Sequence, residues 1–293
     1  MNFSLLPICS YNDLNEEKIW DMSNTIEHIK DVDDSFCVPS EFYTSKDSEG
    51  NDFLLYLDNA SGSNHDEMEL LMNIVYQNKQ SNRSYADLIC DIERCEAGAE
   101  EYSGFVCDCI NQELSFYKMI AISLPTLKEV YRYTARLFND YTSLYCWRKK
   151  CYPELLFTED IFSGADKIGS FQENYTEINK CLSVLNDKGR ELFLMGTEEE
   201  AIASIQAISG VKCSGKGSGE AETFKKKIQF GSKQTTTNQY YISCIPHFKL
   251  DSAYSNKRVH FCWGREEISN HRIIVVHIGE HWSNVNKNLS IIQ

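Results

Sequence analysis

The sequence has no hydrophobic segment long enough to cross a membrane. The longest apolar run in its first two hundred residues is 119–124, which is interrupted by Ser123 and stopped by Pro125. A membrane-spanning helix needs about 20 apolar residues. The first 13 residues also lack the basic leader and the small-residue cleavage site of a secretory signal. We therefore expect a cytoplasmic protein that does not bind a membrane.

The sequence also lacks the Cys-x-x-Cys pairs that many structural zinc sites use. Twelve cysteines are spread over the 293 residues. The close pairs have other spacings: Cys90 and Cys95, Cys107 and Cys109, and Cys146 and Cys151. Each pair lies in or beside a segment expected to be helical, where thiols pack as small hydrophobic groups. We expect reduced thiols without a disulfide scaffold, and neither a metal nor another cofactor.

Charge is divided unevenly along the chain. The whole sequence has 29 basic and 43 acidic residues. Residues 211–293 hold twelve Lys and Arg against six Asp and Glu, so residues 1–210 hold 17 against 37. Five of the seven histidines also lie in 211–293. This asymmetry indicates that the basic end meets a polyanion, or that the two parts of the chain meet each other. An ordinary acidic surface beside a basic loop is the simpler alternative.

Hydrophobic periodicity predicts a mainly helical region over residues 1–208. Apolar side chains recur there at three- and four-residue spacing, as on one face of a helix. The predicted helices cover residues 11–30, 65–78, 84–98, 102–122, 126–150, 172–187 and 198–208. Thr126 with Glu129 and Thr197 with Glu200 have capping-box spacing. The apolar segment 53–57 is expected to be a strand or a buried extended piece.

After Ser209 the sequence takes on the character of a β domain. Glycines among Ser and Lys mark a connector over 210–219. The predicted strands are 239–245, 258–263 and 272–278, which are rich in Tyr, Ile, Val and Phe, with a hairpin connection over 264–270. We therefore expect an α+β protein. An acidic, mainly helical domain over 1–208 is followed by a small antiparallel β domain over 209–293.

Two short motifs in the C-terminal part resemble functional sites but lack the surrounding structure that those sites need. Residues 210–217 come close to a phosphate-binding P-loop, but Gly217 replaces the Ser or Thr that would hold magnesium, and the segment follows a helix rather than a strand. Residues 277–281 read His-x-x-Glu-His, which in zinc peptidases lies on a helix. In this sequence the first histidine of the motif ends a predicted strand and Gly279 follows, so the motif does not lie on a helix. A nucleotide site and a peptidase site are therefore not expected.

A basic cluster lies close in sequence to the Tyr240–Tyr241 pair. Cations beside exposed aromatic rings suit a nucleic-acid backbone with unpaired bases. A solvated loop that docks on the acidic region is the alternative. The candidate nucleic-acid-binding residues are Lys225, Lys226, Lys227, His247 and Lys249.

Segments 258–263 and 272–281 form a pattern of their own. The first opens with Arg258 and aromatic residues, and the second runs into Gly279, Glu280 and His281. The pattern resembles the last hairpin of RelE/ParE-like toxins over residues 240–281. The resemblance implies a compact sheet with a basic face that engages RNA. In the ribonuclease members of that family, a ribose hydroxyl attacks the phosphate in line.

Such cleavage needs a base, a proton donor for the leaving oxygen, and cations to hold the phosphate. The resemblance makes Arg258 the phosphate clamp and places His281 at the Gly-His ending. His260 and His277 become candidate acids or bases if they share an exposed face.

We predict an RNA-directed toxin or antiviral defence effector, a metal-independent endoribonuclease restrained by its acidic helical region. The alternative is a non-enzymatic protein- or nucleic-acid-binding subunit of a larger assembly, whose helical region binds a protein partner.

Overall fold

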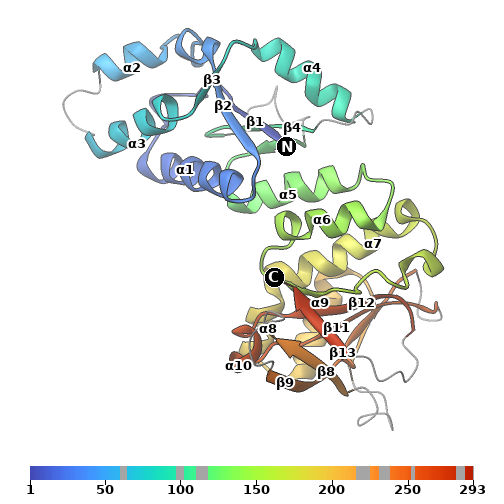
Figure 1. Ribbon diagram of the computed structural model, residues 1–293. Helices are drawn as coiled ribbons and strands as arrows, with labels where there is room; N and C mark the ends of the chain where they lie inside the picture. The colour runs from blue at the N-terminus through green and yellow to red at the C-terminus, as the bar shows by residue number, and fades with distance from the viewer. Residues whose placement is uncertain are drawn as a thin grey trace. The chain divides into compact units, whose positions relative to one another are not determined.

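A computed structural model describes residues 1–59, 65–96, 102–109, 118–215, 225–230, 238–251, 255–281 and 288–292. The chain divides into two compact units, Met1–Leu137 and Phe138–Gln293 (Figure 1). Each unit is built on a sheet of its own. The boundary expected at residues 208 and 209 falls inside the second unit.

The first unit contains a parallel sheet, which the sequence did not lead us to expect. Its strands are β1 (Asn2–Leu5), β2 (Ser35–Pro39), β3 (Lys79–Ser81), β4 (Ser103–Val106) and β5 (Ile120–Ala121). They lie in the order β3-β2-β1-β4-β5, and every neighbouring pair is parallel. The chain moves outward from β1 to β3 and then returns to the other side of β1. This is the strand order of a doubly wound α/β sheet.

Helices lie between the first four strands, and a further helix follows β5. They are α1 (Glu16–Asp31), η1 (Ser40–Tyr43), α2 (Phe53–Asn59), α3 (His65–Tyr76), α4 (Tyr85–Glu96) and α5 (Leu124–Ala135). Asn15 caps α1 by accepting a hydrogen bond from the backbone N–H of Lys18 at 3.0 Å. Ile19, Met22 and Ile29 of α1 are fully buried. Helices α1, α3 and α4 therefore confirm the predicted helices over 11–30, 65–78 and 84–98, although α1 begins later, at Glu16, and α3 ends earlier, at Tyr76.

Three expectations for the helical region are wrong. Residues 53–57 belong to helix α2, which Asp52 caps through the backbone N–H of Leu55 at 2.8 Å. The described parts of the predicted helix 102–122, which are 102–109 and 118–122, hold β4 and β5 rather than a helix. The helix expected over 126–150 is two helices, because Asp140 caps a new one, α6 (Tyr141–Cys151). Strands of a parallel sheet are buried on both faces and lack an alternating pattern, so β4 and β5 read as apolar helix.

The second unit carries a mixed eight-stranded sheet in the order β7-β10-β11-β12-β6-β13-β8-β9. The strands are β6 (Leu156–Thr158), β7 (Cys213–Ser214), β8 (Lys225–Phe230), β9 (Asn238–Ser243), β10 (His247–Lys249), β11 (Lys257–Cys262), β12 (Ile274–Glu280) and β13 (Asn288–Ile292). Strand β6 pairs in parallel with β12 and antiparallel with β13. The expected small antiparallel C-terminal domain is therefore wrong, because an interior strand comes from the region expected to be helical. The fold is mixed α and β.

The remaining helices of this unit are η2 (Ala165–Ile168), α7 (Phe171–Val184), η3 (Leu185–Gly189), α8 (Arg190–Met195), α9 (Glu198–Ser209) and α10 (Glu266–Ser269). Helices α7 and α9 confirm two sequence predictions. Thr197 and Glu200 form the expected capping box of α9. Strands β11 and β12 form the expected antiparallel hairpin, with α10 in its connection. No helix in the described ranges is both long and apolar enough to cross a bilayer.

Candidate functional site

Strands β10, β11 and β12 bring together four of the five C-terminal histidines. His247 lies opposite His260, and His260 lies opposite His277. Directly opposed residues of neighbouring strands project from the same face of a sheet, so these three side chains share one face. The ring centre of His281, one residue beyond β12, lies 6.1 Å from that of His247 and 6.0 Å from that of His260. We call these four residues the histidine cluster.

Two cations lie on the same face. Arg258 is two residues from His260 on β11, and Lys249 is two residues from His247 on β10, so the pleat of each strand directs both toward the face of the cluster. Lys249 and Arg258 are also direct cross-strand partners. The third residue at this level is Gly279 on β12. An added Cβ at Gly279 would lie 2.8 Å from Nε2 of His277, so this position has no room for a side chain.

The opposite face of the three strands is apolar core. Phe248, Val259 and Ile278 are in register across β10, β11 and β12, and all three are fully buried. Burying side chains of this kind stabilises a fold by about 1.5–3 kcal/mol each. This core holds the strands in register and thereby fixes the histidines on the other face.

Burial divides the cluster into two pairs. His260 is 1% exposed and His277 is 7% exposed. His247 is half-buried and His281 is exposed. The expectation that His260 and His277 share a face holds geometrically, but their rings lie in the interior. His247 and His281 are therefore the members that a substrate can reach.

Backbone carbonyls fix the tautomers of three rings. Nδ1 of His247 lies 2.8 Å from the carbonyl oxygen of Ile245, and Nδ1 of His260 lies 3.2 Å from that of Cys244. Nε2 of His277 lies 3.0 Å from the carbonyl oxygen of Glu280. A carbonyl oxygen only accepts, so each of these nitrogens carries the proton. In neutral His247 the lone pair is consequently on Nε2.

Burial and the basic groups around the cluster lower its proton affinity. Burial, with help from Arg258 and Lys249, lowers the pKa of His247 from 6.5 to about 4. Burial, followed by the effects of His247 and His277, lowers the pKa of His260 well below its usual range. Burial and then Arg258 lower the pKa of Lys249. The charged groups with the largest effects are all basic, so an anion placed among them would be stabilised.

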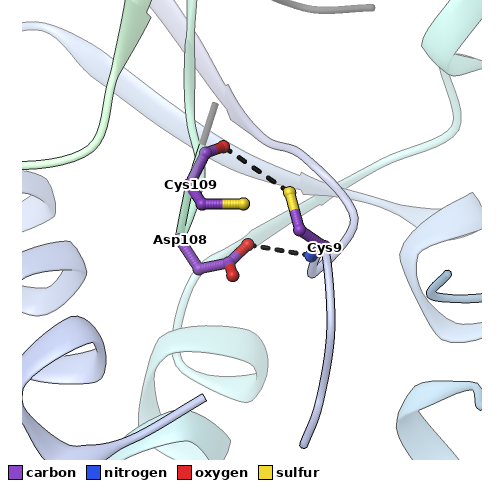
Figure 2. A group of neighbouring side chains, drawn as sticks. All are labelled: Cys9, Asp108 and Cys109. Carbon is purple, nitrogen blue, oxygen red and sulfur yellow. Dashed lines mark hydrogen bonds between the residues drawn. The ribbon is translucent and has the colours of Figure 1, made fainter. Parts of the chain in front are cut away.

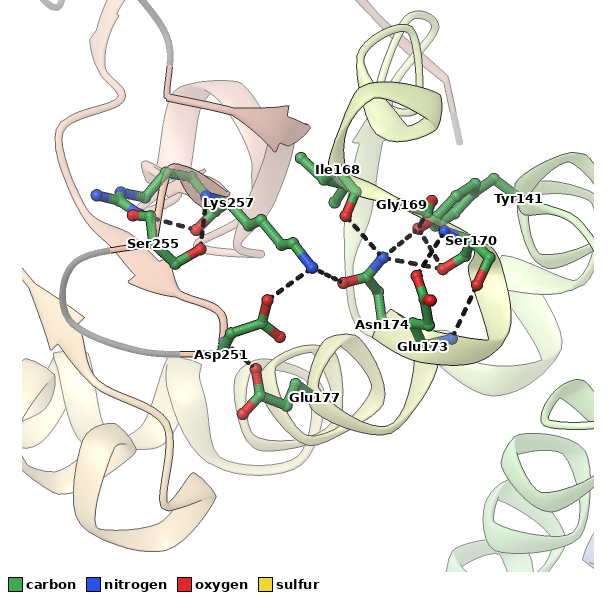
Figure 3. A network of polar contacts seen from close by, with 11 residues as sticks. Tyr141, Ile168, Gly169, Ser170, Glu173, Asn174, Glu177, Asp251, Ser255 and Lys257 are labelled. Atoms are coloured by element: carbon green, nitrogen blue, oxygen red, sulfur yellow. Dashed lines mark hydrogen bonds and ion pairs between the residues drawn. The ribbon is translucent and has the colours of Figure 1, made fainter.

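Helices α6 and α7 hold the connection that leads into Arg258. Nζ of Lys257 lies 2.6 Å from a carboxylate oxygen of Asp251 and 3.0 Å from Oδ1 of Asn174 (Figure 3). Asn174 is buried, and its Nδ2 donates to the hydroxyl of Tyr141 at 3.1 Å and to the carbonyl oxygen of Ser170 at 2.9 Å. No sequence pattern indicates this network, because its members come from three separate segments.

Arg258 is only 8% exposed, and its side chain turns back onto the same connection. Its Nη1 donates to the carbonyl oxygens of Ser255 and Lys257. Its Nε is buried and has no hydrogen-bond partner within the described part of the chain. Arg258 therefore contributes positive charge from just beneath the surface.

The predicted lysine run lies elsewhere in the sheet. Lys225, Lys226 and Lys227 begin β8, which is separated from β11 by strands β12, β6 and β13. Neighbouring strands are about 4.8 Å apart, so β8 is about 19 Å from β11. The side chains of these lysines, and of Tyr240 and Tyr241 on β9, lie outside the described residues. The sheet thus places His247 and Lys249 at the histidine cluster and the lysine run several strands away.

Comparison with known proteins identifies no relative of this chain. No family model, curated protein or solved structure matches the chain.

Proposed function

We propose that this protein is a metal-independent endoribonuclease that acts on RNA in the cytoplasm as a toxin or antiviral defence effector. The observation that supports it is the pairing of His247 and His281, whose rings lie 6.1 Å apart at the accessible side of the cluster, beside Lys249 and Arg258. A pair of imidazoles next to two cations offers an acid, a base and positive charge for a phosphodiester.

In the proposed reaction, Nε2 of His247 takes the proton from a ribose 2′-hydroxyl. The 2′-oxygen then bonds to the adjacent phosphorus, and the bond from phosphorus to the 5′-oxygen breaks. Protonated His281 gives its proton to that leaving oxygen, so the products are a 2′,3′-cyclic phosphate and a 5′-hydroxyl. Lys249 binds a non-bridging phosphate oxygen, and the charge of Arg258 stabilises the negative charge that develops there.

The low pKa of His247 fits the role of base. At pH 7 a ring with a pKa of about 4 is neutral and can accept a proton. An entering phosphate would add the negative charge that the cluster lacks and raise the proton affinity of the neighbouring rings. In this proposal His260 and His277 are positioning residues that support the reactive pair from below.

The acidic balance of residues 1–210 supports a second part of the proposal. A surface of that sign attracts basic partners and repels RNA. We propose that this region binds a protein partner or restrains the enzyme until it is needed.

The test is cleavage of a labelled single-stranded RNA by the purified full chain without added divalent cations. We expect fragments that end in 2′,3′-cyclic phosphate. Replacing His247 by Gln should slow cleavage by about 10²- to 10⁴-fold, the usual contribution of a general base.

The matched control is His271→Asn. His271 is the C-terminal histidine outside the cluster, and its φ of 60° suits Asn, which tolerates the left-handed region. This variant should cleave as the wild type does. If the His247→Gln variant cleaves RNA as fast as the wild type, the assignment of His247 as the general base is wrong. RNA that is bound but stays intact would contradict the enzyme and favour a nucleic-acid-binding subunit.

A further inference from the structure

The parallel sheet of the first unit has a natural place for a ligand. All carboxyl ends of its strands lie at one edge, and the strand order reverses between β1 and β4. In sheets of this kind, ligands bind in the crevice outside the carboxyl ends of the strands at that reversal. The segment after β1 carries Cys9, and the segment after β4 carries Cys107, Asp108 and Cys109.

Three side chains of types that can ligate a metal lie together at this place. The Sγ atoms of Cys9 and Cys109 and a carboxylate oxygen of Asp108 all lie within 4.8 Å of one another. Figure 2 shows the three side chains turned toward a common point. We call them the thiol cluster. Among the described residues it is the only group of three or more His, Cys, Asp or Glu side chains with this spacing.

Hydrogen bonds hold the two segments together around the thiol cluster. The backbone N–H of Cys9 donates to Oδ1 of Asp108 at 2.9 Å, and Sγ of Cys9 lies 3.6 Å from the carbonyl oxygen of Cys109. The backbone N–H of Leu6 donates to the carbonyl oxygen of Val106 at 2.9 Å. The geometry of the cluster is therefore set by the backbone of two paired strands.

The second carboxylate oxygen of Asp108 provides an independent observation. Asp108 is 6% exposed, and its Oδ2 is buried without a hydrogen-bond partner in the described ranges. Leaving a buried charged oxygen unpaired costs more than the roughly 1–3 kcal/mol typical of a neutral group. A cation bound to this oxygen would remove that cost.

We propose that Cys9, Asp108 and Cys109 bind a zinc ion. Two thiolates and a carboxylate carry three negative charges, and soft sulfur ligands select zinc over magnesium or calcium. Zinc displaces the two thiol protons, which pass to the solvent. Zinc takes four ligands, so three protein atoms leave one position for a water molecule or a substrate group.

Burial opposes the thiolate form that a zinc ligand needs. It raises the pKa of both Cys9 and Cys109, and the negative charge of Asp108 raises the pKa of each thiol further. A bound zinc ion supplies the positive charge that makes the thiolates stable.

The test measures zinc in the purified full chain, kept reduced throughout and produced without a metal-binding tag. We expect about one zinc ion per chain, bound at least 100-fold more tightly than by the Cys9→Ser/Cys109→Ser variant. Cys90→Ser is the matched control, because it removes an exposed thiol in the same unit. It should keep its zinc.

Cobalt replacement provides a second readout in case the double variant does not fold. Cobalt bound by thiolates absorbs strongly through sulfur-to-metal charge transfer, whereas cobalt bound by imidazoles does not. Asp108→Asn keeps the hydrogen bond from Cys9 and should weaken cobalt binding without loss of fold. The proposal is overturned if the wild type shows no charge-transfer band. It is also overturned if a Cys9–Cys109 disulfide persists under reducing conditions, or if zinc is lost only in the His247→Gln variant.

Discussion

The histidine cluster and the thiol cluster call for ions of opposite sign. The first collects imidazoles and two cations, and burial followed by the neighbouring basic groups lowers the pKa of His247, Lys249 and His260. The second collects two thiols and a carboxylate, and burial raises the pKa of its thiols. In both places like groups have been drawn together at a cost in free energy. The difference teaches that the two clusters favour opposite ligands: the charges around the histidines favour an anion, and the donor set of the thiol cluster favours a cation.

The largest expected effect is the stabilisation of the first unit by zinc bound at the thiol cluster. At zinc concentrations about 100 times Kd, a bound ion stabilises the native state by about 2.7 kcal/mol. A chelator should therefore speed hydrogen exchange in β1 and β4 by about 100-fold and leave β11 and β12 unchanged. Hydrogen exchange followed by mass spectrometry measures both regions in one experiment. The same change in the Cys9→Ser/Cys109→Ser variant would show that the chelator acts elsewhere.

A smaller effect is expected from protons at the histidine cluster. The pKa of His247 is about 4 in the folded chain, against an ordinary value of 6.5, so the unfolded chain takes up the proton first as the pH falls. The stabilisation from neutral His247 is complete above pH 6.5 and is lost as the pH falls toward 4. Between pH 7.5 and 4.5 the wild type should lose about 2 kcal/mol more than His247→Gln.

Denaturant unfolding at the two pH values measures this difference, and His271→Asn is the control that should follow the wild type. If both histidine variants and the wild type lose the same stability, the cluster does not depress the pKa of His247.

The smallest effect concerns the binding of RNA at the histidine cluster. Replacing Lys249 by Glu puts a carboxylate beside Arg258 and among the histidines, where it occupies the place of a phosphate. RNA affinity should fall about tenfold, or about 1.4 kcal/mol. The salt dependence of binding should also weaken by the equivalent of one or more phosphate contacts. Titration of a labelled RNA at several salt concentrations measures both quantities.

Lys180→Glu makes the same charge change on the exposed surface of α7 and serves as the control. If it weakens binding as much as Lys249→Glu, the RNA responds to overall charge rather than to the histidine cluster.

The two clusters also differ in how far the sequence could predict them. The histidine face could be anticipated because β11 and β12 form a hairpin, in which short-range pattern and turn fix the pairing. The burial of His260 could not be anticipated, because the sequence of the hairpin does not indicate which segments pack against it. Helices α7 and α9 were likewise predicted from local periodicity and caps.

The thiol cluster could not be predicted from local sequence patterns. Cys9 and Asp108 are 99 positions apart, and they meet only because β1 and β4 are neighbours in a parallel sheet. The pair Cys107 and Cys109 was noted for its spacing, but only Cys109 joins the cluster. Strands of two to five residues carry too little pattern to distinguish them from helix, so the sheet that creates the site was missed.

Strand β6 sets the order in which the second unit can be assembled. Its Thr158 donates to the carbonyl oxygen of Val276, 118 positions later, and the strand lies between β12 and β13. As the chain is synthesised, β6 emerges long before the neighbours that complete its hydrogen bonding. Contacts between such distant segments slow folding, because the intervening chain must first be ordered. The sheet therefore closes only after the last residues of β12 and β13 have been made, and it is exposed to misassembly until then.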